Sequence, residues 1–122
     1  MNMLNSIILE GDITKVGTLE CQFTDVPQIT VIIAVERTFR GSKGNTVSEV
    51  SEFEVIAYGK TAEFLSKKGV KGQGIRVVGR LKQFKWLDGE KELSKVIVVA
   101  EHIEYKPKKS QKKETENEES VF

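Results

Sequence analysis

Apolar and polar residues alternate along much of this chain, and that two-residue period is typical of β-strands with one buried face. The pattern is clearest over residues 28–39 and 74–86. Residues 6–13, 50–58 and 93–105 contain shorter or more apolar stretches of the same kind. The sequence therefore predicts five strands.

The segment between the third and fourth predicted strands favours a short helix over residues 59–69. Thr61 can cap its start, and Ala62 and Leu65 fall on one side of it. Gly69 can end it, because glycine commonly follows the last turn of a helix. The expected order is thus three strands, one helix and two strands.

This order predicts an all-β fold, the five-stranded Greek-key barrel called the OB-fold, with one short helix between strands three and four. Gly11 and Gly79 lie inside predicted strands, where glycine often marks a bulge or a sharp bend. They favour a coiled sheet that closes on itself. The alternative is an open antiparallel sheet with one helix. Residues 1–105 form the expected domain.

The predicted strand over residues 74–86 has two contrasting faces. Alternation places Ile75, Val77, Gly79 and Leu81 toward the core. The opposite face carries Arg76, Val78, Arg80, Lys82, Phe84 and Trp86. Cations are unsuited to a core and large rings are costly on an open surface, so this face is predicted to bind a polyanion with flat bases. The alternative is a solvated cationic face whose rings cover a neighbouring chain.

Further aromatic and basic residues extend this pattern to other predicted strands. Residues 28–39 begin apolar and end with Arg37 and Phe39, on the parity of Ile33 and Val35, which suits a projecting finger. Rings can stack on any base, each stack contributing roughly 1–3 kcal/mol, and cations bind the phosphates. The predicted stacking residues are Phe39, Tyr58, Phe84 and Trp86, and the predicted phosphate-binding residues are Arg37, Arg40, Lys43, Lys60, Arg76, Arg80, Lys82 and Lys85.

The net charge is only +1, so the distribution of charge is more informative than its sum. After residue 105 come five lysines, then four glutamates, then Ser120-Val121-Phe122. Because residues 106–122 lack apolar side chains until the last two positions, they are predicted to form a disordered tail.

Catalytic chemistry finds little support in the sequence, and no cofactor or metal site is expected. Cys21 is the single cysteine, which excludes an internal disulfide, and no Cys/His spacing suits a metal. His102 shares the parity of Val96, Val98 and Ala100 and is predicted to be a structural histidine. No apolar run approaches the roughly 20 residues of a membrane helix, and no secretory leader is visible. We therefore expect a non-enzymatic cytoplasmic protein.

Several stretches of the chain, taken in order, resemble the bacterial single-stranded DNA-binding protein family. They cover residues 5–11, 53–63, 68–69 and 78–86, and the run Tyr58-Gly-Lys-Thr-Ala-Glu63 is the most specific of them. The acidic end of the chain, with its terminal phenylalanine, also resembles the tail of that family.

The resemblance implies a homotetramer of OB-folds that binds and protects single-stranded DNA, with little sequence preference, during replication, recombination and repair. It also implies a nucleoid-associated location and an acidic tip that recruits replication and repair proteins. Phe39, Tyr58 and Trp86 match the family's stacking positions, with Phe39 in place of a usual tryptophan. The implied tip comprises Glu118, Glu119, Ser120, Val121 and Phe122.

The chain departs from the family pattern at several positions. Glu52 stands where many members have an aromatic residue, six positions before Tyr58. Phe53 has the opposite parity to Tyr58 and is predicted to face the core or a subunit contact. Residues 12–27 lack the family's usual Asp-Pro and arginine pattern, and no proline precedes Phe122.

Two other functions stay open at the level of sequence. An OB-fold assembly module, such as a primosome component, would bury these rings in a protein interface. An RNA-binding OB domain would use the same stacking, because discrimination from DNA depends on groups that sense the 2′-hydroxyl.

Overall fold

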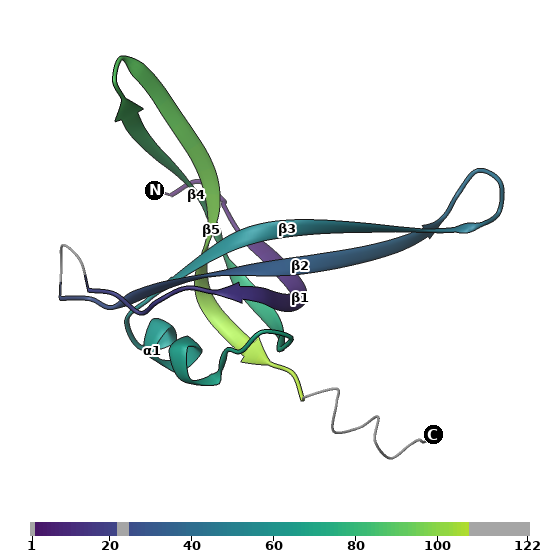
Figure 1. Ribbon diagram of the computed structural model, residues 1–122, viewed down its shortest axis with the longest axis horizontal. Helices are drawn as coiled ribbons and strands as arrows, with labels where there is room; N and C mark the ends of the chain where they lie inside the picture. Colours follow the sequence, from purple (N-terminus) through teal and green to yellow (C-terminus); the bar gives the residue numbers. More distant parts are fainter. Residues whose placement is uncertain (1, 22–24, 108–122) are drawn as a thin grey trace.

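The computed structural model describes residues 2–21 and 25–107. The predicted tail therefore falls almost entirely outside the described residues, and so does its acidic tip. The described ranges form five strands and one helix (Figure 1). They are β1 (Ile7–Val16), β2 (Gln28–Arg40), β3 (Thr46–Tyr58), α1 (Gly59–Lys68), β4 (Gly74–Asp88) and β5 (Lys91–Tyr105).

The five strands form a closed barrel in the order β1-β2-β3-β5-β4, with β4 paired back to β1. β3 and β5 run parallel, whereas the other neighbours are antiparallel. The predicted OB-fold topology is confirmed, and the open sheet is excluded.

Two hairpins extend well beyond the barrel and diverge from each other as arms (Figure 1). The β2–β3 arm comprises residues 36–50, and the β4–β5 arm comprises residues 81–96; both are largely exposed. Both are longer than the predicted strands, since pairing continues to Arg40–Thr46 and to Asp88–Lys91. At the second tip Gly89 adopts φ +68°, a conformation that tight hairpin turns require.

The core fills the inside of the barrel with aliphatic side chains from every strand. Ala62 and Leu65 of α1 join this core with no measurable exposure, so the helix covers one end of the barrel, as their spacing predicts. Among the largest fully buried side chains are Ile13, Ile29, Ile33, Leu65 and Ile75.

The start of α1 differs from the prediction. The helix begins at Gly59 and its N-cap is Tyr58, without a side-chain capping hydrogen bond, so Thr61 does not cap it. Gly59, at φ +65°, lets the chain turn from β3 directly into the helix. Gly69 ends the helix as predicted, and its N–H donates to the Leu65 carbonyl oxygen at 2.8 Å.

A β-bulge lies where Gly79 falls in β4, as a glycine inside a strand indicates. A methyl group on Gly79 would collide with the carbonyl oxygen of Val99, so the two backbones approach more closely than any side chain permits. The bulge also shifts the alternation of β5. Beyond Ala100, Ile103 packs against the core, while the His102 side chain is 63% exposed. The parity that grouped His102 with Val98 and Ala100 therefore does not hold beyond the bulge.

Candidate nucleic-acid interface

The side chains of β3, β5 and β4 that point away from the core form one continuous surface, here called the outer face. It is made of Ile56 and Tyr58 from β3, Leu93, Lys95, Ile97 and Val99 from β5, and Arg80, Lys82, Phe84 and Trp86 from β4. Register places Arg80 beside Val99 and Phe84 beside Lys95, while β3 lies on the other side of β5. Three adjacent strands therefore contribute to a single surface.

An apolar patch occupies the middle of the outer face. Ile56, Ile97 and Val99 are 5%, 5% and 3% exposed, and Tyr58 and Phe84 pack against them while staying partly accessible. Two of the predicted stacking residues, from different strands, thus share one apolar floor. Such a floor fixes the position of the rings and leaves part of each free for a flat ligand.

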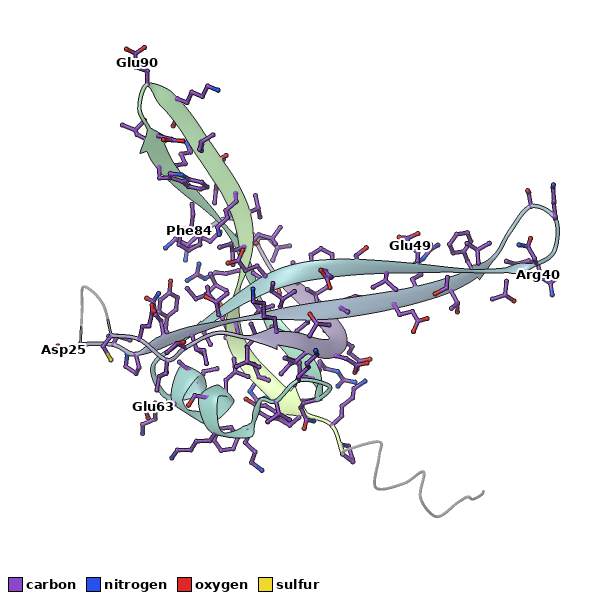
Figure 2. The ribbon with its side chains drawn as sticks, viewed as in Figure 1. Asp25, Arg40, Glu49, Glu63, Phe84 and Glu90 are labelled. Atoms are coloured by element: carbon purple, nitrogen blue, oxygen red, sulfur yellow. The ribbon has the colours of Figure 1, made fainter. Side chains whose placement is uncertain are left out.

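Trp86 lies further out on the β4–β5 arm. Its side chain is 44% exposed, and it shares the side of β4 that carries Phe84 and Lys82. The Lys82 ammonium lies 4.9 Å from the centre of the Phe84 ring. Phe84 lies near the base of this arm and Glu90 at its tip (Figure 2). Rings and cations therefore follow one another along the same side of the arm.

The predicted division of β4 into two faces holds within the barrel and fails at Leu81. Ile75, Val77 and Gly79 are buried, whereas Leu81 is 43% exposed because the strand leaves the barrel there. The Asn5 side chain donates to the Leu81 carbonyl oxygen at 2.8 Å and accepts from its N–H at 3.0 Å. These two bonds satisfy the backbone where the arm departs.

Two cations of the outer face, Arg80 and Lys95, each have one carboxylate neighbour. Arg80 Nε is 3.3 Å from a Glu101 oxygen, and Lys95 Nζ is 3.2 Å from a Glu54 oxygen. All four side chains are at least about a third exposed, and exposed ion pairs of this kind contribute little to stability. Both cations can therefore exchange a carboxylate for a phosphate at small cost.

Arg76 differs from these cations because two carboxylates hold it. Its Nη2 is 2.6 Å from Glu10, and its Nη1 is 3.3 Å from Glu104. The hydrogen bond from Arg76, followed by that from Lys106, lowers the pKa of Glu10. Because β4 begins near Arg76 and runs away from it, this cluster lies apart from Phe84 and Trp86, and we expect Arg76 to contribute less to anion binding than Lys82.

The predicted residues of the β2–β3 arm lie away from the outer face. Phe39 is 37% exposed, and the Arg37 guanidinium covers its ring at 4.7 Å while lying 3.6 Å from Glu49. Gln28 of β2 pairs with Tyr58, and alternation puts Phe39 on the opposite side of β2 from Gln28. Arg40 lies far out along this arm, and Lys43 is exposed in its turn (Figure 2). The structure thus gives two separate groups of rings and cations.

Two further lysines and Phe53 complete the set of sequence-derived positions. Lys60 is exposed in the first turn of α1, and Lys85 lies on the side of β4 opposite to Phe84 and Trp86. Phe53 is 38% exposed on the side opposite to Tyr58, so its parity is as predicted but it is not enclosed in the core.

The apolar floor of the outer face was missed at the level of sequence, although a signal for it exists. Unbroken apolar runs cover residues 55–57 and 96–100. Such runs are typical of strands that are buried on both sides rather than one. Lys95, which the register of the β4–β5 hairpin places beside Phe84, was also overlooked.

Other kinds of site find no support in the described ranges. No group of three or more histidine, cysteine, aspartate or glutamate side chains there could hold a metal ion. No helix in this part of the chain is both long and apolar enough to span a membrane. Cys21 is free and exposed.

A closed Greek-key barrel with a helix after its third strand, bearing rings and cations on an exposed outer face, defines an OB-fold of the nucleic-acid-binding type. The Single-strand binding protein family matches residues 4–106. The chain belongs to this family.

Individual relatives agree with this membership. The single-stranded DNA-binding protein of Aquifex aeolicus is 32% identical over 119 residues, which cover 96% of this chain and 81% of the relative. That of Thermotoga maritima is 28% identical, covering 99% and 86%. The wild-type single-stranded DNA binding protein from Thermus aquaticus superimposes with a TM-score of 0.74 at 29% identity, covering 88% of this chain and 52% of that one.

A more distant structure shares the fold alone. The Plasmodium falciparum SSB, solved in complex with ssDNA, superimposes with a TM-score of 0.76 at 17% identity, covering 88% of this chain and 98% of that one. The barrel and its helix are therefore kept at an identity where little of the sequence is shared.

Proposed function

We propose that this chain binds single-stranded DNA without catalysis and with little sequence preference. The observation that carries the proposal is the outer face, where Tyr58 and Phe84 share one apolar floor and Trp86 follows on the same side of β4. Bases stack on these rings, and phosphates bind Arg80, Lys82 and Lys95. Membership of the family, and the names of the relatives, support this choice of ligand.

The affinity then comes from two terms with different properties. Each base stacked on a ring contributes roughly 1–3 kcal/mol and is largely independent of base identity. Each phosphate neutralised by a cation adds affinity that falls as salt concentration rises. Arg37, Phe39, Arg40 and Lys43 on the β2–β3 arm, and Lys60 on α1, extend the contact beyond the outer face.

Titration of tryptophan fluorescence tests this proposal, because Trp86 is the only tryptophan in the chain. We expect single-stranded oligothymidylate to quench the emission, duplex DNA of equal length to have little effect, and affinity to fall linearly on a logarithmic scale with salt. Equal quenching by duplex would exclude base stacking as the main interaction. Tighter binding of oligouridylate would favour an RNA ligand, and the absence of any response would favour the assembly module.

The wider roles follow from family membership and form part of the proposal. The chain acts in replication, recombination and repair as a nucleoid-associated homotetramer in the cytoplasm. Its acidic tip, Glu118 to Phe122, recruits partner enzymes by placing Val121 and Phe122 in an apolar pocket with basic surroundings.

Deletion of residues 118–122 tests the role of the tip. We expect the shortened chain to lose partner enzymes in a pull-down while it still quenches with oligothymidylate. Unchanged recovery of those enzymes would contradict the role of the tip, and a monomeric mass in sedimentation equilibrium would contradict the tetramer.

A further inference from the structure

A pocket of about 260 Å³ lies between the beginning of α1 and the end of β5. This volume is just below the range of about 300–1,000 Å³ that is usual for small-molecule sites, so it suits one flat ring system rather than a large cofactor. The pocket is lined by Lys60, Thr61, Phe64, His102, Ile103 and Tyr105.

The pocket begins where the outer face ends. β3 and β5 are parallel, with Ile56 beside Val99, and both strands run toward α1. β3 therefore finishes at Tyr58, two residues before Lys60, while β5 reaches His102 shortly after Val99. The bulge in the β4–β5 pair turns His102 outward at this point. A strand of DNA that crosses the outer face past Tyr58 arrives at the pocket.

The lining combines an exposed ring with a second ring whose hydroxyl is buried. Phe64 is 51% exposed, and its ring meets the Tyr105 ring edge to face with centroids 5.5 Å apart. The Tyr105 hydroxyl is buried without a hydrogen-bond partner among the described residues. Burial raises the pKa of this hydroxyl.

The exposed Phe64 ring offers a surface on which a flat ligand can lie. A nucleobase has a π face that stacks on such a ring. Lys60, which lines the same pocket, and Lys68, whose ammonium lies 5.7 Å from the Phe64 ring centre, provide positive charge for the attached phosphate. A free anion would use the lysines but not the ring.

We propose that this pocket binds one base of the single-stranded DNA, at the end of the outer face that lies nearest α1. The base lies against Phe64, and its phosphate lies near Lys60. The inference rests on the proposed function, and it assigns to the α1 side of the barrel a nucleotide site separate from Trp86.

His102 is the only histidine of the chain and lines the pocket, so its signal reports on the pocket. Trp86, the only tryptophan, reports on the β4–β5 arm. In the full-length protein we expect oligothymidylate to shift the His102 imidazole proton resonance over the concentrations that quench Trp86. Phe64→Ala should weaken oligothymidylate binding by about threefold to tenfold and reduce the His102 shift. Phe64→Tyr keeps an aromatic ring and should bind as the unaltered chain does, which guards against a variant that fails to fold. Ser66→Ala, exposed on α1 outside the pocket, is the matched control and should behave as the unaltered chain.

The possible results separate this inference from the proposed function. Quenching of Trp86 without a shift of His102 overturns the pocket and leaves the outer face standing. Failure of both signals overturns the proposed function itself. An equal His102 shift with inorganic tripolyphosphate shows an anion site only, and unchanged oligothymidylate affinity in Phe64→Ala likewise overturns the base site.

Discussion

Replacement of Trp86 with alanine is expected to weaken oligothymidylate binding by about 1–3 kcal/mol, which is roughly a fivefold to 150-fold rise in Kd. The ring is 44% exposed on the side of β4 that carries Phe84 and Lys82, so its loss removes a stacking surface and leaves the apolar floor intact. Because the arm lies outside the barrel core, the fold should persist. A fluorescently labelled oligothymidylate, followed by anisotropy, measures the change without relying on the missing tryptophan.

Leu87→Ala is the matched control for this substitution. Leu87 is the next residue on the same strand, is 73% exposed and points to the other side of the arm. Its removal should change the oligothymidylate affinity by less than about twofold, since a side chain that faces away from the bases contributes no stack. Equal losses from both variants would mean that the arm acts as a whole, and not through one side.

Gly79→Ala is expected to lower the free energy of unfolding by about 3 kcal/mol, at the upper end of the usual cost of overpacking. The added methyl group would collide with the Val99 carbonyl oxygen and come within 3.2 Å of the Ala100 Cα atom, and both are backbone atoms that cannot rotate away. The β4–β5 pair would have to separate at the bulge that carries the strands out of the barrel. Urea denaturation followed by circular dichroism measures the loss.

Gly74→Ala provides the comparison for Gly79. A methyl group there would meet the side chains of Asp12 and Lys106 at 3.3 and 3.4 Å, and the flexible lysine can move aside. Gly74 does not adopt a positive φ, so an alanine there adds no backbone strain. We expect a change below about 1 kcal/mol. A similar loss in both variants would show that lost glycine flexibility, rather than close approach to Val99, is responsible.

Alternation alone was enough to predict which side of β4 faces the core, because Ile75 and Val77 sit in an uninterrupted pairing with β1. The same reasoning failed at His102, since one extra residue in β5 reverses every later side chain, and its place is marked by Gly79 in the partner strand and by nothing in β5 itself. At Leu81 the predicted side of β4 was right, but the side chain is exposed because the strand has left the barrel there. Periodicity predicts which side of a strand a residue faces, whereas the burial of that residue depends on whether another element packs against that side.

The candidate site shows the same limit in three dimensions. Tyr58 and Phe84 could each be identified as exposed rings from their strands, but their common floor depends on the parallel pairing of β3 with β5. Phe39 carries the same kind of sequence signal and lies on the other arm. Long-range register, which a single strand does not encode, decides which rings act together.

The divergence of the two arms has a mechanical consequence for any polymer held by both. A chain that contacts both arms at once must span the space between them, because the two hairpins diverge (Figure 1). Tension applied to the ends of that polymer would load the two contacts separately and detach one arm before the other. Release under load would then proceed in two stages, with the remaining arm still able to recapture the free segment.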